Sequence, residues 1–156
     1  MTTGQRIVEN WFEERQWQPF AWQRTVWDHC LKGTKGLLNA PTGSGKTFAL
    51  FMPSLISWID AHPDAYKEKE NNGLQLLWIT PLRALAKDLE QHMQQVVSDL
   101  DIPWLVQRRT GDVSSAVKEK QKRRMPEVLI TTPESLNILL AHKGHTKRFS
   151  RLSTVV

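Results

Sequence analysis

The sequence predicts an α/β fold in which a parallel sheet is covered by helices on both faces. Two observations support this prediction. From Gly36 to the end of the chain, short apolar segments alternate with segments whose apolar residues recur at helical spacing. In addition, residues 40–47 have the pattern of a phosphate-binding loop, which connects a strand to a helix. Strands that alternate with helices form parallel sheets through right-handed crossovers.

The elements are expected in a fixed order along the chain. Leu37 and Leu38 are expected to form a buried strand, and helical spacing begins at Phe48. The turn Thr110-Gly111-Asp112 is a possible cap for the helix that follows it, and Thr132 is expected to cap a helix that begins at Pro133. The remaining strands are predicted at 74–79, 104–106, 128–130 and 152–156, and the helices at 82–100, 113–124 and from 133 to the Lys143-Gly144 stop.

Two parts are expected, an N-terminal helical region of residues 1–35 and a nucleotide-binding domain of residues 36–156. The final apolar strand has no polar residue or turn after it, so we expect the sequence to be part of a longer protein. Four of the seven tryptophans, Trp11, Trp17, Trp22 and Trp27, lie in the first region. Aromatic rings dominate core burial, so we expect these residues to pack a helical layer, although one of them could instead stack on a base.

Composition narrows the class of protein. The apolar runs are too short to cross a membrane, no apolar stretch follows the N-terminus, and the single Cys30 fits a reducing compartment. We therefore expect a cytoplasmic protein. The formal net charge of +5 permits an anionic partner. Basic residues gather in one region, where they could equally form a solvated helix face: Arg108, Arg109, Lys118, Lys120, Lys122, Arg123 and Arg124.

The phosphate-binding loop is the strongest functional signal. Gly43 and Gly45 give the backbone the freedom to wrap amide groups around a phosphate at a helix N-terminus. Lys46 can reach the β- and γ-phosphates, and the Thr47 hydroxyl can bind the Mg²⁺ that bridges them. The alternative is a Gly-Ser linker between two elements. The residues expected to bind the nucleotide here are Pro41, Thr42, Gly43, Ser44, Gly45, Lys46 and Thr47, of which Lys46 and Thr47 are the catalytic candidates and Thr47 is the metal ligand.

Five segments resemble the motifs of superfamily-two helicases in the correct order. The run Ala-Pro-Thr-Gly-Ser-Gly-Lys-Thr of residues 40–47 resembles motif I, in which the first position is commonly Ala. Residues 80–85 resemble motif Ia, residues 110–112 the turn between motifs Ia and Ib, and residues 131–136 motif Ib. Upstream, residues 19–23 resemble the end of the Q motif, which Gln23 completes.

Longer phrases resemble the large helicase-related (Lhr-like) group, and within it most closely the ligase-associated DEXH-box DNA helicases. Examples are Trp-Gln-Pro-Phe-Ala-Trp-Gln and Leu-Trp-Ile-Thr-Pro-Leu-Arg-Ala-Leu-Ala. The resemblance implies a RecA-like fold, the first of two such domains. Family members follow the last strand with an Asp-Glu-x-His box, motif II, which this sequence does not reach. Because motif II is expected to hold the metal ion and position the attacking water, the resemblance implies that residues 1–156 alone do not hydrolyse ATP.

The resemblance also implies roles and partners. Gln23 would read the adenine edge of ATP, although a surface glutamine on a helix is the alternative. Single-stranded DNA would be the substrate, with three-prime to five-prime translocation, DNA repair and a DNA ligase as possible partner. Residues at three strand ends would contact the nucleic-acid backbone: Thr80, Pro81, Arg83, Arg109, Thr110, Gly111, Asp112, Thr131, Thr132, Pro133 and Glu134.

Three alternatives remain open at this point. The first is an RNA helicase, because backbone contacts alone do not distinguish DNA from RNA unless the 2′-hydroxyl is used. The second is a P-loop ATPase or kinase that does not act on nucleic acid. The third is a non-catalytic nucleotide- or nucleic-acid-binding module. For the strand-end residues, a simple helix start at Thr132-Pro133 and a solvated Arg83 are the plainer interpretation of the residues alone.

Overall fold

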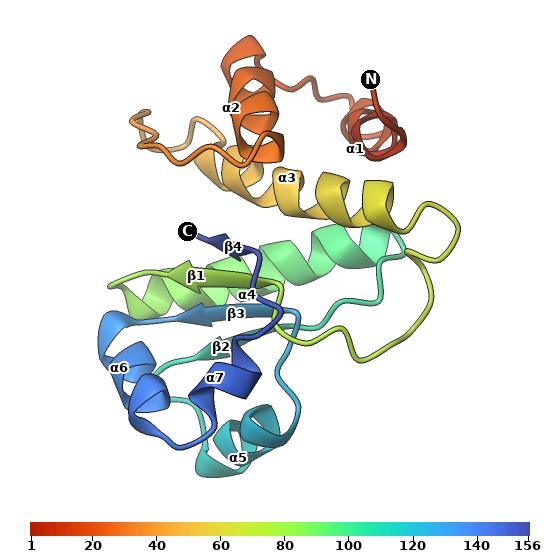
Figure 1. Ribbon diagram of the computed structural model, residues 1–156. Helices are drawn as coiled ribbons and strands as arrows, with labels where there is room; N and C mark the ends of the chain where they lie inside the picture. The colour runs from red at the N-terminus through yellow and green to blue at the C-terminus, as the bar shows by residue number, and fades with distance from the viewer. The chain divides into compact units, whose positions relative to one another are not determined.

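The computed structural model describes all residues from Met1 to Val156, which divide into two compact units, Met1–Lys67 and Glu68–Val156. The first unit, unit 1, holds the three N-terminal helices and the loop of residues 40–47. The second, unit 2, holds the sheet and the remaining helices (Figure 1). This division places the phosphate-binding loop with the N-terminal helices, whereas the boundary expected from the sequence lay after residue 35.

In unit 1, helices α1 (Thr3–Glu13) and α2 (Ala21–Leu31) lie on the same side of α3 (Lys46–Ala61) (Figure 1). A capping box starts α1: the Gln5 amide N–H donates to Thr2 Oγ1 at 3.2 Å, and the Thr2 N–H donates to Gln5 Oε1 at 2.8 Å. Helix α1 approaches α3 at Gly4, where a Cβ would lie 2.5 Å from the Ile56 carbonyl oxygen. Only glycine fits this close crossing.

Aromatic rings form the core between the helices of unit 1. Trp11, Phe12 and Trp27 are buried, and the ring centroids of Trp11 and Phe12 lie 5.6 and 5.7 Å from that of Phe48. The Trp27 indole N–H donates to the Phe48 carbonyl at 3.3 Å, so its one polar group is satisfied. The prediction of a packed helical layer is confirmed for Trp11 and Trp27, whereas Trp17 is 50% exposed.

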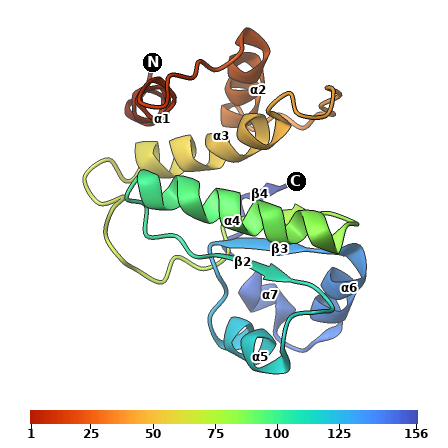
Figure 2. The same cartoon turned by 180° about the vertical axis from the view of Figure 1, so that it is seen from behind.

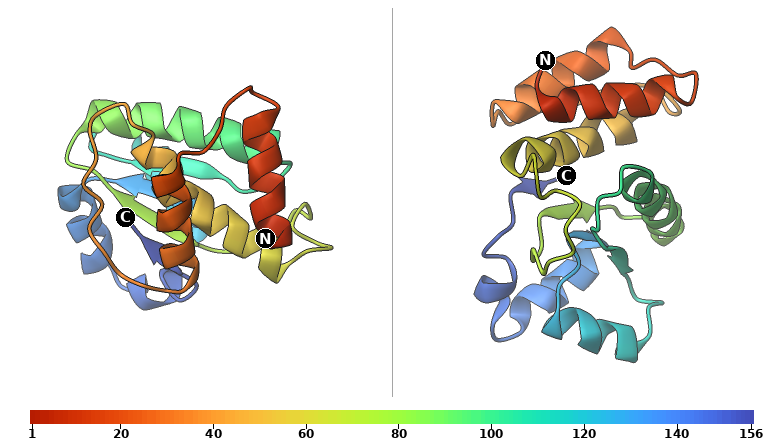
Figure 3. Two further views of the ribbon diagram at one scale, coloured as in Figure 1. Left: turned by 90° about the horizontal axis from the view of Figure 1, so that it is seen from above. Right: turned by 90° about the vertical axis from the view of Figure 1, so that its right-hand side faces the viewer.

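Unit 2 contains a parallel four-stranded sheet in the order β2-β3-β1-β4. Leu76 of β1 lies beside Val128 of β3 and Thr154 of β4, and Val106 of β2 also lies beside Val128. Helix α4 covers one face, while α6 and α7 lie on the other (Figures 2 and 3). The strands are β1 (Leu76–Ile79), β2 (Val106–Arg109), β3 (Val128–Thr131) and β4 (Thr154–Val155), and the helices are α4 (Arg83–Asp99), α5 (Ser115–Arg123), α6 (Pro133–Ala141) and α7 (His145–Arg148).

Alternation along the strands explains the two covered faces. Leu77 and Leu129 belong to a buried cluster with Leu139 of α6, and Phe149 after α7 packs against the same cluster. The intervening residues of β1 and β3 point to the opposite face, which α4 covers with Leu89, Met93 and other buried residues. The prediction of a parallel sheet with helices on both faces is thus confirmed.

Three local predictions are wrong. Leu37 and Leu38 form no strand, and Leu37 is 95% exposed, because two apolar residues cannot hold an extended segment without a paired neighbour. The strand expected at residues 104–106 begins two residues later, since the Leu105 N–H donates to the Glu127 carboxylate at 2.9 Å rather than to a strand. Helix α5 is capped by Ser114, whose Oγ accepts the Val117 N–H, and not by the turn of residues 110–112.

Candidate functional site

The first candidate site is the loop of residues 40–47 in unit 1. Gly43 and Gly45 both have left-handed backbone angles, with φ of +76° and +87°, which non-glycine residues rarely adopt. Gly45 is the N-cap of α3 and has no side chain to accept the amide groups of the first turn. These N–H groups have no intrahelical partner, so the start of α3 presents donors suited to an anion. A triphosphate fits this arrangement.

Hydrogen bonds within the loop fix its shape. Ser44 Oγ donates to the Pro41 carbonyl at 2.7 Å, which closes the turn. Lys46 Nζ donates to the same carbonyl at 2.9 Å and also to the Ala40 carbonyl. The ammonium group therefore already lies over the loop, close to where phosphates would bind. Thr42 is exposed, and Thr47 is half-buried in the first turn of α3.

Gln23 joins α2 to the loop. Its side chain is 2% exposed, so the sequence-based alternative of a surface glutamine is wrong. Oε1 accepts the Phe20 N–H at 2.8 Å, and Nε2 donates to the Gly45 carbonyl at 2.9 Å. Each end of the amide keeps one unused hydrogen-bonding position, because the nitrogen has two N–H donors and the oxygen two lone pairs. Adenine reading by Gln23 stays a prediction.

The second candidate site is the carboxyl edge of the sheet in unit 2, where β1, β2 and β3 end. The Thr80 N–H donates to the Thr131 carbonyl at 2.9 Å, and Thr131 Oγ1 donates to the Arg109 carbonyl at 2.7 Å. These bonds tie the three strand ends together, so the structure brings the three predicted turns to one edge. In Figure 1 the edge lies on the left, where α4 and α6 begin.

The predicted residues at this edge fall into two groups by exposure. Thr80, Thr110, Thr131 and Thr132 are at most 3% exposed. Their hydroxyls serve the protein itself: Thr110 bonds Asp112, and Thr132 Oγ1 accepts the Ser135 N–H as the predicted N-cap of α6. The exposed group, which could contact a ligand, consists of Pro81, Arg83, Gly111, Asp112, Pro133 and Glu134.

Arg83 connects the three turns on the exposed side. Its guanidinium lies over Gly111, where a Cβ would be 2.9 Å from Nη2, so a larger residue there would have to displace the Arg83 side chain. The pKa of Glu134 is lowered by its own backbone N–H, by the Thr132 hydroxyl and by the positive charge of Arg83. Arg83 thus stands between the turn of residues 110–112 and the start of α6, with most of its side chain in solvent.

Arg109 does not join this exposed group. It is 4% exposed, and Nη1 donates to the Lys118 carbonyl at 3.0 Å and to Gln121 Oε1 at 3.2 Å. Burial lowers the pKa of the guanidinium. The residue therefore holds α5 to the end of β2. The sequence-based assignment of Arg109 to a nucleic-acid contact is not the role that this geometry favours.

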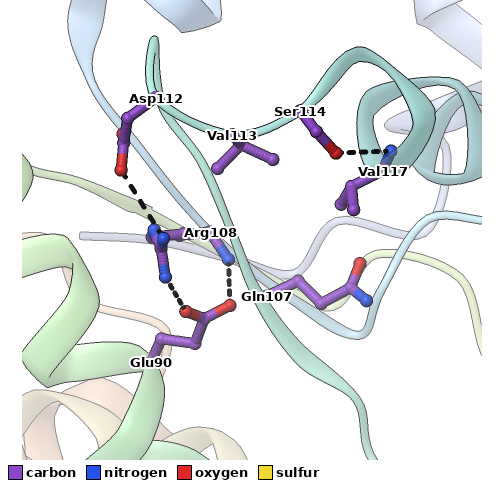
Figure 4. A pocket seen from close by; sticks show the side chains of 7 residues that line it. All are labelled: Glu90, Gln107, Arg108, Asp112, Val113, Ser114 and Val117. Carbon is purple, nitrogen blue, oxygen red and sulfur yellow. Dashed lines mark hydrogen bonds and ion pairs between the residues drawn. The ribbon is translucent and has the colours of Figure 1, made fainter.

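Two ion pairs at Arg108 lie beside the edge (Figure 4), and the one with Glu90 could not be predicted because its partners are 18 residues apart along the chain. Arg108 Nη1 lies 2.6 Å from Glu90 Oε2 of α4, and Nη2 lies 3.5 Å from Asp112 Oδ2. The pKa of Asp112 is lowered by the Thr110 hydroxyl, by its own backbone N–H and by the charge of Arg108. These residues line a hollow of about 330 Å³. Arg108 is thus a structural residue of the basic region.

Comparison with known proteins identifies the family of this chain. A family model described as DEAD/DEAH box helicase matches residues 20–156. The ATP-dependent helicase Lhr-Core of Sulfolobus acidocaldarius is 34% identical over 155 residues, which cover 96% of this chain and 17% of that protein. The Lhr helicase/uracil glycosylase of Escherichia coli is 30% identical over 148 residues, which cover 88% of this chain and 10% of that protein.

A solved structure gives the same relationship in three dimensions. The Mycobacterium smegmatis helicase Lhr bound to ssDNA and AMP-PNP superposes with a TM-score of 0.74 at 31% identity, covering 96% of this chain and 19% of that one. The fold is therefore that of a RecA-like helicase domain. This chain spans less than one fifth of the length of each of these three relatives. None of its helices combines the length and apolar character needed to cross a membrane.

Proposed function

Because this chain belongs to the DEAD/DEAH box helicase family, we propose that it binds ATP at residues 40–47 and forms part of an ATP-dependent DNA helicase. The observation that carries the proposal is the start of α3. Two left-handed glycines place amide groups without a side-chain cap beside the Lys46 ammonium. A triphosphate is the anion that uses both features, because its oxygens accept from the amides and its charge is balanced by the lysine.

Lys46 has the central role in this mechanism. Its Nζ leaves the carbonyls of Ala40 and Pro41 and contacts the β- and γ-phosphates, where it neutralises charge that develops during phosphoryl transfer. Thr47 would hold Mg²⁺ through its hydroxyl, and the ion would supply positive charge that offsets the charge of the phosphate oxygens. The contribution of this chain to catalysis is thus the positioning of phosphates and the placement of charge.

The nucleic-acid substrate is assigned to the carboxyl edge of unit 2. Open α/β sheets bind ligands at this edge, and among the exposed residues there Arg83 is suited to a phosphate. Arg83 supplies an exposed guanidinium, which can donate to the phosphate oxygens of a nucleic-acid backbone. Such contacts carry no base specificity. Single-stranded DNA is the proposed substrate, because the Mycobacterium smegmatis relative was solved with ssDNA.

Turnover of the intact polypeptide tests the ATP site. Single-stranded DNA should stimulate ATP hydrolysis, and Lys46→Ala should lower it by at least about 100-fold, since one preorganised charge-stabilising group contributes several kcal/mol. Single-stranded RNA in a parallel assay tests the alternative substrate: stronger stimulation by RNA would reassign the nucleic acid. A Lys46→Ala protein with near wild-type turnover would remove the assignment of the loop, and an ATPase that ignores nucleic acid would indicate another P-loop enzyme.

Binding of DNA by an Arg83→Ala variant tests the carboxyl edge. We expect the affinity for single-stranded DNA to fall about 3- to 10-fold and the slope of log affinity against log salt to fall by about 0.7, the contribution of one single-strand phosphate contact. Arg6→Ala is the matched control, because Arg6 is exposed on α1, outside the edge. Equal effects of the two variants, or an unchanged salt slope, would exclude Arg83 as a phosphate contact.

Translocation and biological role are finer parts of the proposal. The sequence resemblance to ligase-associated helicases supports three-prime to five-prime movement on single-stranded DNA and a role in DNA repair beside a DNA ligase. Displacement of streptavidin from biotin at one end of an oligonucleotide measures direction in the intact polypeptide. Displacement only from the five-prime end would support the proposed direction, and displacement only from the three-prime end would contradict it.

A further inference from the structure

The edge of unit 2 opposite Arg83 contains a strongly basic hollow. It has a volume of about 490 Å³ and lies where β1, β3 and β4 begin. Three segments line it: the end of α5 and the residues before β3, helix α7, and the turns that precede β1 and β4. No carboxylate is among the lining residues. The cationic residues that line it are Lys122, Arg123, Arg124, Lys147, Arg148 and Arg151.

Several of these guanidinium groups are held in place by backbone carbonyls. Arg148 Nε donates to the Lys122 carbonyl at 3.4 Å and Nη1 to the Lys143 carbonyl at 3.3 Å. Arg151 Nη1 donates to the Asn71 carbonyl at 3.3 Å. A guanidinium has five N–H donors, so each keeps donors for a further acceptor. The site is therefore organised before any ligand binds, which lowers the entropic cost of binding.

The charges in the hollow are largely uncompensated. Lys122 forms an ion pair with Glu119 at 2.6 Å, and the other five cations reach no carboxylate within ion-pair distance. The positive charge of Arg148 also acts on Arg109. Burial is the largest cause that lowers the pKa of Arg109, and repulsion from Arg148 lowers it further. A protein surface that gathers like charges in this way is suited to an anionic ligand.

Helix ends explain only part of the cluster. Basic residues are favourable in the last turn of a helix, which accounts for Lys122 and Arg123 in α5 and for Lys147 and Arg148 in α7. Arg124 and Arg151 lie outside both helices, yet they line the same hollow. Arg151 also packs against Gly73, where a Cβ would lie 3.2 Å from its Cδ. The gathering of all six therefore needs a second reason.

We propose that this hollow binds phosphate groups of a nucleic-acid backbone, as a second contact at the sheet edge opposite Arg83. The inference rests on the proposed function, because nucleic acid is the polymer assigned to the carboxyl edge. Arginine donors match phosphate oxygens in a bidentate manner. Met125 is the one apolar side chain in the lining, so the hollow offers no platform for a base. Binding is thus independent of sequence and sensitive to salt.

The location of the hollow predicts a dependence on strand length. Strands β1 and β3 have four residues each, so the two edges are separated by at least about 10 Å at 3.3 Å per residue. At about 3.4 Å per nucleotide, a strand of about four nucleotides that occupies the carboxyl edge cannot also reach the hollow, whereas a strand that extends well beyond the edge can. The second contact should therefore strengthen the binding of long strands only.

A double variant of the intact polypeptide, Arg123→Gln with Lys147→Gln, tests this inference. Both residues are exposed and make no side-chain bond that supports the fold. Single strands of about 4 and about 40 nucleotides serve as probes, the shorter at the lower limit of the site size of a single module. For the long strand we expect a 3- to 10-fold loss of affinity and a salt slope lower by about 1.4, two contacts at about 0.7 each. Binding of the short strand and ATP turnover without DNA should stay unchanged.

The matched control is Arg6→Gln with Lys32→Gln, which removes one arginine and one lysine from exposed positions of unit 1. Wild-type affinity of the double variant for the long strand, a loss equal to that of the control, or an equal loss for both lengths would overturn the inference. So would loss of polyglutamate or pyrophosphate binding without loss of DNA binding, which would assign the hollow to an acidic protein or a small anion. Failure of the proposed function differs, since the wild-type protein would then bind neither strand.

Discussion

The phosphate-binding loop and the carboxyl edge of unit 2 are built on different principles. In the loop, consecutive residues from Ala40 to Thr47 provide the backbone shape, the amide donors and the ammonium group, and Gln23 alone joins from another element. At the edge, turns from three distant segments meet, and about half of the predicted residues are buried. A loop motif therefore names its contacting residues directly, whereas a strand-end motif mixes contacting residues with those that hold the turns together.

Among the substitutions that separate these two regions by stability and binding, the largest effect is expected at Gly45. An alanine there would have to adopt a left-handed conformation, which costs roughly 1–2 kcal/mol, and its Cβ would lie 2.6 Å from Gln23 Nε2. Gly43→Ala is the control, since it has a similar φ but nothing within 4 Å of its Cβ. We expect Gly45→Ala to lower the thermal stability of the unliganded protein more than Gly43→Ala does. We also expect it to lower the affinity for ATP by at least about tenfold.

If the two alanine variants melt at the same temperature, the contact between Gln23 and Gly45 adds nothing to the shape of the loop. The loop would then be as self-contained as its sequence suggests. A larger loss at Gly45 would instead show that the loop depends on α2.

The next prediction concerns the carboxyl edge, where Arg109 supports the fold and Arg83 is proposed to contact nucleic acid. Arg109→Met should destabilise the protein by about 1–3 kcal/mol, because the Lys118 carbonyl and Gln121 Oε1 lose a buried donor. Arg83→Met should change stability by less than about 0.5 kcal/mol, as expected at an exposed position. Denaturant unfolding measures the change in stability of both variants, and their binding of single-stranded DNA is measured separately.

The two arginines should thus show opposite profiles. Arg83→Met should weaken DNA binding without loss of stability, and Arg109→Met should lose stability. A stable Arg109→Met protein with weakened DNA binding would restore the direct contact that the sequence predicted for this residue.

The same contrast explains how far the sequence could be interpreted. Local patterns were sufficient for α4, for the N-cap at Thr132 with Pro133, and for the glycines of the loop, because caps, turns and helical periodicity depend on neighbouring residues. Pairing and burial depend on distant residues. Leu37 and Leu38 are apolar but have no paired neighbour, and Arg109 lies beside Arg108 in sequence while only one of them is buried.

The basic region shows why the charge pattern of the sequence could not predict the role of each basic residue. Seven cations between residues 108 and 124 appeared as one cluster in the sequence. In the structure five of them separate into an ion pair at Arg108, a buried group at Arg109 and three residues that line the basic hollow, Lys122, Arg123 and Arg124, whereas Lys118 and Lys120 lie on α5 outside the hollow. The other three cations of that hollow come from residues 147–151, so no window of sequence contains the whole site.

The smallest effect concerns the choice of base at Gln23. Its amide is held by the Phe20 N–H and the Gly45 carbonyl, so Gln23→Ala should loosen the loop and lower the affinities for ATP and for GTP by the same factor. Adenine reading would use the one N–H and one lone pair that remain, and it would add about 0.5–1.5 kcal/mol of loss for ATP alone. Equilibrium binding of both nucleotides separates the two contributions. A common loss with no difference would restrict Gln23 to the support of the loop, whereas a loss for ATP alone would show that the loop keeps its shape without this residue.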